Sequence, residues 1–340
     1  MPMSKYANKE VLPSNLLDHR AVKAWRRIKP ECFEPQNIEV LKLKTRKSAV
    51  YRLTGAGSNG SAIIAKRCQA ATASVERVVY EEFLPGLPLP ALRCHGFVEE
   101  PGGEFCWLFL EDAGGQEYSP ASAAHRALAG QWLASVHRAP FATGLQARLP
   151  DRGPAHYLQL LRSSRAALLE HAGNPVLSAD EVALVRRFAA CGDAIEAHWD
   201  EVEKSCGKLP RTLVHGDFVI KNLRVHAGAT TGPALLVFDW EMAGWGVPAT
   251  DLAQFVGRCA SPELKVYCPA VRHDFPQLDL RDIQRLADYG NVLRMVDKVF
   301  WATVSMEGSS YEFLVNPLSH LRSYEPEMVA ALRAVNWRCA

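Results

Sequence analysis

The stretch LVHGDFVIKNL, residues 213–223, places two polar groups after an apolar run. Asp217 follows the run after a histidine and a glycine, and Asn222 is the fifth residue after Asp217. A second apolar run, LLVF at 235–238, ends at Asp239. We expect two short strands that carry two carboxylates and an amide into loops. Phosphoryl transfer uses this combination, because a carboxylate can face the acceptor hydroxyl while oxygen ligands hold magnesium on the nucleotide phosphates.

The chain before this stretch predicts a small antiparallel sheet with one helix. Strand-like runs separated by turn residues occupy 38–43, 49–53, 62–66, 93–98 and 105–110. Ser74 is a candidate N-cap for a helix whose apolar residues recur at helical spacing until Pro85 and Gly86. This part of the chain is therefore expected to form a sheet with a single helix.

The chain after residue 115 predicts a mainly helical region. Ala- and Leu-rich runs cover 120–138, 153–172 and 178–203, and the last begins with a capping box, Ser178 to Glu181. The whole pattern predicts an α+β protein. We expect an N-terminal extension at 1–37, a region with a small sheet and one helix at 38–112 and a mainly helical region at 113–340.

Composition excludes several classes of partner. The 340 residues include 39 Lys and Arg against 37 Asp and Glu, so the net charge of +2 would attract neither nucleic acid nor an anionic membrane. The first residues carry early charges without an apolar core, and no later run approaches the length of a membrane span. The nine cysteines form no C-x-x-C pair that would suggest zinc. We therefore expect a cytoplasmic protein, and the sequence does not indicate its oligomeric state.

The H-x-D-x-x-x-x-N spacing of residues 215–222, with Asp239 after it, resembles the catalytic loop and metal-binding aspartate of the aminoglycoside phosphotransferase and choline kinase family. The runs DWE at 239–241 and GWGVPATDLA at 244–253 resemble the same family, and the resemblance covers residues 38–256. It implies a protein-kinase-like fold with two lobes, an N-terminal nucleotide-binding lobe at 38–112 and a helical lobe for catalysis and substrate binding at 113–340. It also implies an ATP- and Mg²⁺-dependent kinase that moves the γ-phosphate to a hydroxyl of a small molecule.

The resemblance assigns roles to the residues of the central stretch. Asp217 becomes the catalytic base or the group that orients the hydroxyl, and Asn222 and Asp239 become magnesium ligands. The competing interpretation is that buried Asp and Asn side chains tie loops together through backbone hydrogen bonds. Three such residues at this spacing favour the catalytic interpretation, whereas His215 is expected to pack and to form hydrogen bonds.

A kinase of this kind also needs a strand lysine for the nucleotide phosphates and a helix glutamate that holds it. Lys66, at the end of the third predicted strand, fits the first role. Glu76 fits the second role because it precedes Tyr80 in an E-x-x-x-Y arrangement, with Glu81 and Glu82 as alternatives.

The remaining nucleotide contacts are expected in two places. The loop at 44–48 should cover the phosphates through Ser48 and backbone amides, and adenine should lie near the connector between the predicted lobes, at Leu110, Glu111 and Asp112. GAGSNG at 55–60 satisfies G-x-G-x-x-G but lies between two predicted strands, so we interpret it as a turn rather than a dinucleotide site.

Other functions fit less well. A regulatory pseudoenzyme that binds nucleotide on the same fold would be expected to have lost Lys66, Asp217, Asn222 or Asp239, and all four are present. A metal-dependent hydrolase would need more histidine and carboxylate ligands. A protein kinase would carry Asp-Phe-Gly and Ala-Pro-Glu, which are missing after Asp239.

The acceptor is less well defined than the reaction. Candidates are an antibiotic such as an aminoglycoside, which would make the protein a resistance enzyme, or a sugar, an amino alcohol or another metabolite. The last 80 residues carry 10 acidic against 9 basic side chains, a balance too even to favour a polycation. We expect acceptor discrimination to map to 258–325, where Trp301, Tyr311, Phe313 and Tyr324 are candidate pocket aromatics.

Overall fold

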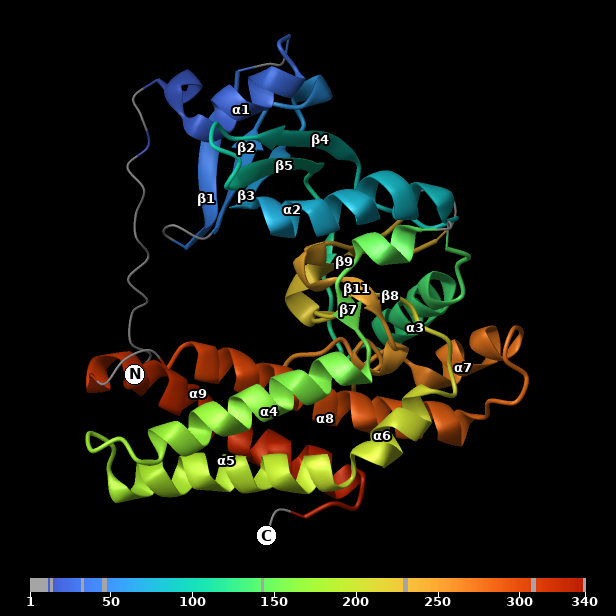
Figure 1. Ribbon diagram of the computed structural model, residues 1–340. Helices are drawn as coiled ribbons and strands as arrows, with labels where there is room; N and C mark the ends of the chain where they lie inside the picture. The colour runs from blue at the N-terminus through green and yellow to red at the C-terminus, as the bar shows by residue number, and fades with distance from the viewer. Residues whose placement is uncertain are drawn as a thin grey trace. The chain divides into compact units, whose positions relative to one another are not determined.

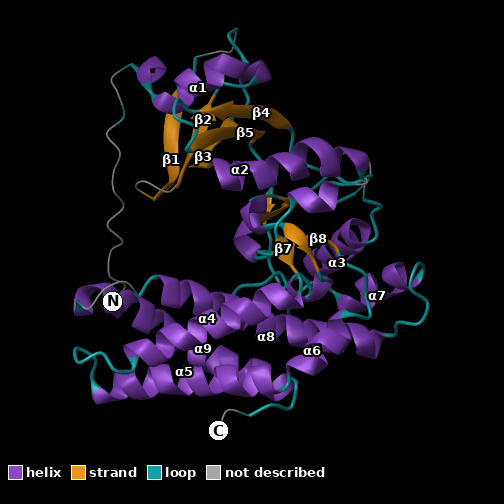
Figure 2. Cartoon of the chain, viewed as in Figure 1, coloured by secondary structure: helices purple, strands orange, loops and turns teal. Residues whose placement is uncertain are grey.

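The computed structural model describes residues 12, 15–31, 34–44, 48–141, 144–228, 232–306 and 310–338. The chain divides into two compact units, Met1–Gln116 with Arg224–Glu241, and Glu117–Leu223 with Met242–Ala340. Figure 2 shows a sheet with few helices in the first unit and mainly helices in the second. The predicted α+β class is confirmed.

The first unit is built on a five-stranded antiparallel sheet (Figure 1). Its spatial order is β1 (Asn37–Lys44), β2 (Ser48–Thr54), β3 (Ile63–Gln69), β5 (Phe105–Glu111) and β4 (Cys94–Glu99). Every other residue of β2 is buried, as the alternating sequence predicts for a strand with one face on the core. The five predicted strands are therefore present, with ends that differ by a few residues.

Helix α1 (Arg20–Ile28) packs on this sheet. Its Val22 and Trp25 belong to the same buried cluster as Tyr51 and Phe109 of the strands. The Trp25 indole donates a hydrogen bond to the backbone oxygen of Ala56, 3.1 Å away. Residues ahead of the first strand, which carry no recognisable motif, thus complete the hydrophobic core of the first unit.

Helix α2 (Ala70–Arg77) follows β3 directly and continues as a π-helical turn over Val78–Phe83. Ser74 therefore lies inside the helix rather than at its N-cap, and its hydroxyl donates to the backbone oxygen of Ala71. The helix begins earlier than predicted because the amide of Ala70 is held by the backbone oxygen of Glu104 on leaving the sheet.

The first unit is completed by a second, small sheet. Its order is β10 (Ala234–Val237), β9 (Leu223–His226) and β6 (Gln116–Glu117), and β10 ends just before Asp239. A later part of the chain thus returns Asp239 to the unit that contains Lys66.

The second unit consists mainly of helices. They are α3 (Ala123–His137), α4 (Pro154–His171), α5 (Ala179–Ala197), α6 (Trp199–Cys206), α7 (Leu264–Arg272), α8 (Leu280–Val304) and α9 (Tyr311–Ala334). A three-stranded sheet accompanies them, in the order β7 (Asp151–Arg152), β11 (Gly244–Gly246) and β8 (Thr212–Val214). The predicted capping box at Ser178 and Glu181 is confirmed.

The helix predicted at 178–203 is two helices, because His198 between them leaves the helical conformation (φ −113°, ψ 19°). Its ring Nδ1 contacts the backbone oxygen of Ala194 at 2.9 Å, and the ring stacks on Trp337. Tertiary packing at the histidine thus interrupts a run that is helical by composition.

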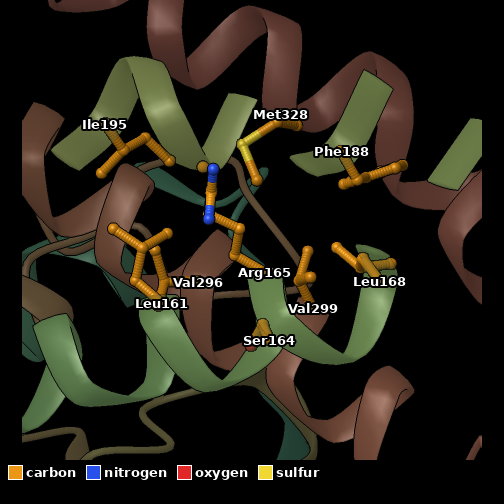
Figure 3. A pocket seen from close by; sticks show the side chains of 10 residues that line it. Leu161, Ser164, Arg165, Leu168, Phe188, Ile195, Val296, Val299 and Met328 are labelled. Atoms are coloured by element: carbon orange, nitrogen blue, oxygen red, sulfur yellow. The ribbon is translucent and has the colours of Figure 1, made fainter. Parts of the chain in front are cut away.

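Helices α4, α5, α8 and α9 enclose a small cavity of about 10 Å³ (Figure 3). Its lining is mostly apolar and includes Leu161, Phe188, Gly192, Ile195 and Met328. This volume is at most that of a single water molecule, so the cavity is a packing defect rather than a ligand site. Among the described residues, no helix combines the length and the apolar character needed to cross a membrane.

Candidate active site

Lys66 lies in a cluster of carboxylates in the first unit. Its ammonium donates hydrogen bonds to Glu76 Oε1 and Asp239 Oδ1 and lies 3.3 Å from Glu241 Oε2. Lys66 is on β3 and Glu76 is on the helix that follows, so the short connection brings the two together. Of the three glutamates considered for this role, Glu76 is the one that binds Lys66; Glu81 and Glu82 are exposed.

Lys66 keeps its charge in this cluster although it is buried. Burial lowers the pKa of Lys66, but the attraction of Glu76, Asp239 and Glu241 outweighs it and raises the pKa well above its usual value. Burial raises the pKa of Glu76 to about 7, against the opposing effect of Lys66. Lys66 is therefore a fixed cation, held by carboxylates of Glu76, Asp239 and Glu241.

The same carboxylates fit a divalent cation. Oxygens of Glu76, Asp239 and Glu241 lie within 4.8 Å of one another, and Glu76 Oε2 is buried without a hydrogen-bond partner. Carboxylate oxygens are the ligands that magnesium prefers. An unpaired buried carboxylate oxygen beside two further carboxylates is an arrangement that a cation would stabilise.

The backbone of Asp239 has an unusual conformation, with φ at +66°. Among residues with a side chain, Asp is one of those that tolerate the left-handed region, and such strained residues cluster at functional sites. Glu241, two residues further on, was not among the expected site residues; the DWE run was the signal that could have identified it.

Asp217 lies in the second unit, in the loop after β8, and two cations bind it. Arg294, on α8, donates to Asp217 Oδ1 at 3.1 Å and to the backbone oxygen of Gly216 at 2.8 Å. The ammonium of Lys221 lies 3.2 Å from Asp217 Oδ2. Asn222 Nδ2 donates to the Asp217 backbone oxygen at 2.9 Å and to its Oδ2 at 3.2 Å.

These contacts keep Asp217 ionised. Burial raises the pKa of the carboxyl, but Arg294 and then Lys221 lower it further, so that its pKa lies below the usual value. A carboxylate of this kind accepts a hydrogen bond readily and is a weak base. Arg294 was missed at the sequence level because an arginine in a helix 77 positions after Asp217 has no spacing signal.

Asp251 fixes the loop that carries Asp217. Its carboxylate accepts the backbone N–H of His215 at 2.7 Å and that of Gly216 at 3.0 Å. His137 Nε2 lies 3.4 Å from the same carboxylate, and its Nδ1 lies 3.1 Å from the Tyr267 hydroxyl. A buried hydrogen-bonded network thus supports the loop that carries Asp217.

Glycine is required at position 216. Its φ is +73°, and a Cβ there would lie 2.3 Å from the backbone oxygen of Met242. The His215 ring accepts the backbone N–H of Asp217 at 3.2 Å, so this histidine shapes the turn.

The other expected nucleotide contacts lie in the first unit. Ser48 begins β2, two residues before Val50, which pairs with Lys66; residues 45–47 of the expected phosphate loop lie outside the described residues. Leu110 is buried, Glu111 Oε1 accepts the Arg93 amide at 2.8 Å, and Asp112 Oδ2 accepts the guanidinium of Arg52 at 2.6 Å. The two acidic side chains of the connector thus have structural partners.

The chain matches a known protein family in sequence and known structures in fold. Residues 47–289 match the model of the phosphotransferase enzyme family, APH. No curated protein sequence matches the chain closely enough to count as a relative.

Several solved structures share the fold. An aminoglycoside phosphotransferase, APH(2'')-IIIa, solved with GDP and kanamycin, has 14% sequence identity, with 89% of this chain and 97% of that chain covered at a TM-score of 0.60. The ethanolamine kinase of Plasmodium vivax has 14% identity, 91% and 87% coverage and a TM-score of 0.59. A spectinomycin phosphotransferase solved with ADP and spectinomycin has 11% identity, 89% and 93% coverage and a TM-score of 0.60. At these identities the likeness establishes the fold alone.

Proposed function

Because the chain belongs to the phosphotransferase enzyme family, we propose that it transfers the γ-phosphate of ATP to a hydroxyl group of a small molecule. The observation that carries this proposal is the ionised carboxylate of Asp217, which Arg294 and Asn222 hold in place. The Lys66 cluster supplies the second requirement, a fixed cation beside ligands for magnesium.

On the nucleotide side, Lys66 binds phosphate oxygens, and Glu76 holds the ammonium in position. Asp239 and Glu241, two members of the acidic cluster, are proposed magnesium ligands. Asn222 is proposed as a further ligand from its place in the H-x-D-x-x-x-x-N motif. When bound, magnesium neutralises negative charge on the phosphates. The backbone at Leu110, Glu111 and Asp112 is the proposed contact for the base, and Ser48 for a phosphate oxygen.

On the acceptor side, Asp217 accepts a hydrogen bond from the hydroxyl and directs its oxygen toward the γ-phosphorus. The new oxygen–phosphorus bond forms as the bond to the β-phosphate oxygen breaks, and ADP leaves. The hydroxyl proton passes to Asp217. Because the pKa of this carboxyl is low, Asp217 acts mainly by orienting the hydroxyl, and the proton moves late.

Helix α8 offers a face for the acceptor. Asp297 follows Arg294 by one turn, and its carboxylate is hydrogen-bonded to Trp301, which is half exposed. Tyr311 and Tyr324 have other partners, since Tyr311 donates to Glu181 and the Tyr324 ring lies against the ammonium of Lys298. We propose that acceptor discrimination resides in 258–325. Of the four candidate aromatics, Trp301 is the nearest in sequence to Arg294, which binds Asp217.

The test is release of ADP from ATP in the presence of magnesium, across a panel of antibiotics, sugars, amino alcohols and nucleosides. An acceptor should stimulate release by the wild type. In Asp217→Ala, turnover should fall by about two to four orders of magnitude, because the oriented carboxylate is lost while nucleotide binding remains. Turnover at the wild-type rate in this variant would refute the mechanism. Bound ATP without turnover on any acceptor would favour a regulatory nucleotide-binding protein instead.

A further inference from the structure

The loop LAQFVGRCASP, residues 252–262, has a strained backbone. Phe255, Arg258 and Ser261 have φ values of +56°, +62° and +52°. Residues with a side chain rarely adopt this region, and a bulky residue such as phenylalanine is a clear outlier there. Such strain persists only where the surrounding structure enforces it, and it clusters at functional sites.

Hydrogen bonds hold the loop in this conformation. Within the loop, the amide of Phe255 donates to Ser261 Oγ at 2.9 Å. The amide of Gln254 donates to Asn291 Oδ1 on α8 at 2.7 Å, and that of Gly257 donates to Glu327 Oε2 on α9 at 2.9 Å. The loop is therefore fixed to two helices of the second unit.

The same loop is paired with the catalytic loop. The amide of Ile220 donates to the backbone oxygen of Arg258 at 3.0 Å, and the amide of Ala260 donates to that of Phe218 at 3.1 Å. Val219 and Cys259 form an isolated antiparallel bridge. The residues that follow Asp217 directly thus rest on the strained loop.

One of the strained residues, Phe255, carries an exposed aromatic ring. Phe255 is 75% exposed, more than any other large hydrophobic residue in the described part of the chain. A single exposed hydrophobic residue is ordinary on a protein surface. This one combines exposure, a left-handed backbone and a place beside the catalytic loop, although glycine would adopt the same backbone without strain. Packing in the fold does not explain a ring that is 75% exposed, so a ligand is the better explanation.

The charged side chains near the loop of Phe255 indicate which kind of ligand its ring would bind. The Asp217 carboxylate is bound by Arg294 and Lys221, and Glu327 is bound by Lys298 at 2.7 Å. These pairs leave no excess of negative charge that would attract a polycation. An aromatic ring instead offers contact to the apolar face of a ring compound.

We propose that Phe255 is a specificity-determining residue of the acceptor site and that its ring is the platform for the apolar face of an uncharged, hydroxyl-bearing ring compound. This inference rests on the proposed transfer to a hydroxyl group and narrows its acceptor class. It adds to the proposed segment 258–325 a determinant three positions before it.

The first experiment uses Phe255→Gly in the full chain. Glycine removes the ring and suits the backbone, so the melting temperature should stay the same or rise. The KM for the acceptor should rise at least tenfold, while kcat and the KM for ATP stay near wild type. In Phe255→Tyr the aromatic ring is kept, so the acceptor KM should stay near its wild-type value. The control is Leu169→Ala, which removes a large hydrophobic side chain that is 45% exposed on α4, outside the segment 258–325, and should leave the acceptor KM unchanged.

Calorimetry separates this inference from the proposed reaction. The probes are uridine, 4-nitrophenyl glucoside and the polycation kanamycin, each titrated into wild type and Phe255→Gly. We expect an uncharged probe to bind the wild type and to lose at least tenfold in affinity in the variant. If the acceptor KM and the probe affinity are the same in wild type and Phe255→Gly, or if kanamycin is the only probe that binds, the proposal that Phe255 forms a platform for the acceptor is wrong. Binding that depends on Phe255 without any release of ADP would support the platform and refute the transfer; binding by none of the three would overturn the acceptor class.

Discussion

Two glycines inside helices of the second unit should respond in opposite ways to replacement by alanine. Gly290 lies in α8, where a Cβ would be 1.9 Å from the backbone oxygen of Ala249. Gly192 lies in α5 beside the small cavity of Figure 3, where the nearest atoms to a Cβ would be 3.7 Å away. The two substitutions are chemically identical and differ only in the space available.

The expected magnitudes follow from that difference. In Gly290→Ala, the helix and the turn at 248–250 must separate by about 1.5 Å, which costs about 1–3 kcal/mol or more, while the better helix propensity of alanine returns at most about 1 kcal/mol. In Gly192→Ala, the better helix propensity of alanine is not opposed by a steric clash, so the substitution should stabilise the fold by about 0.5–1 kcal/mol. We expect Gly290→Ala to lower the melting temperature by several degrees and Gly192→Ala to raise it by about 1–3 °C.

The Gly290 variant should also lose activity. The displaced turn leads into Asp251, whose carboxylate holds the backbone amides of His215 and Gly216. Movement there shifts Asp217, and a misplacement of 1 Å in an active site reduces turnover by about a hundredfold. Thermal unfolding followed by circular dichroism and the ADP-release assay measure both effects. A Gly290→Ala protein as stable as wild type, or two variants that shift in the same direction, would refute the packing argument.

Two further predictions concern charge. Arg294→Met removes the main group that lowers the pKa of Asp217, so burial should raise that pKa and move the acid limb of the pH profile of kcat/KM to higher pH. Lys221→Met is the control, because Lys221 is largely exposed and solvent weakens its effect; equal shifts in the two variants would contradict the role of buried Arg294. Asp239→Asn keeps the size of the side chain and its tolerance of a left-handed backbone but removes the charge. Its affinity for magnesium–ATP, measured by calorimetry, should fall at least tenfold while its affinity for ATP without metal changes less; an equal loss with and without metal would argue against a metal ligand.

Part of the fold and part of the candidate site could be predicted from the sequence. Local patterns predicted the sheet and the capping box of α5, because alternation and capping depend on neighbours in the chain. The spacing around Asp217 pointed to the loop that the structure shows to be buttressed by Asp251. These features are encoded within a few residues, and a single sequence is enough to identify them.

What the sequence did not reveal depends on contacts between distant segments. Arg294 meets Asp217 across 77 positions, and α1 packs on strands that begin after it. The break at His198 comes from tertiary packing against Trp337, which overrides helix-forming composition. The left-handed backbone of Phe255 is imposed by partners on α8 and α9, and neither the residue type nor its neighbours indicates it.

The contact of Lys66 with Asp239 spans 173 positions, and this has a consequence for synthesis of the protein. A ribosome that has made the five strands and α2 has produced Lys66 and Glu76 without the carboxylate that completes their cluster. Over the time needed to make the intervening residues, at about 5–20 residues per second, the nascent sheet carries a buried lysine that is only partly neutralised. We expect the nascent first unit to reach its final stability only after residue 241 has left the ribosomal tunnel.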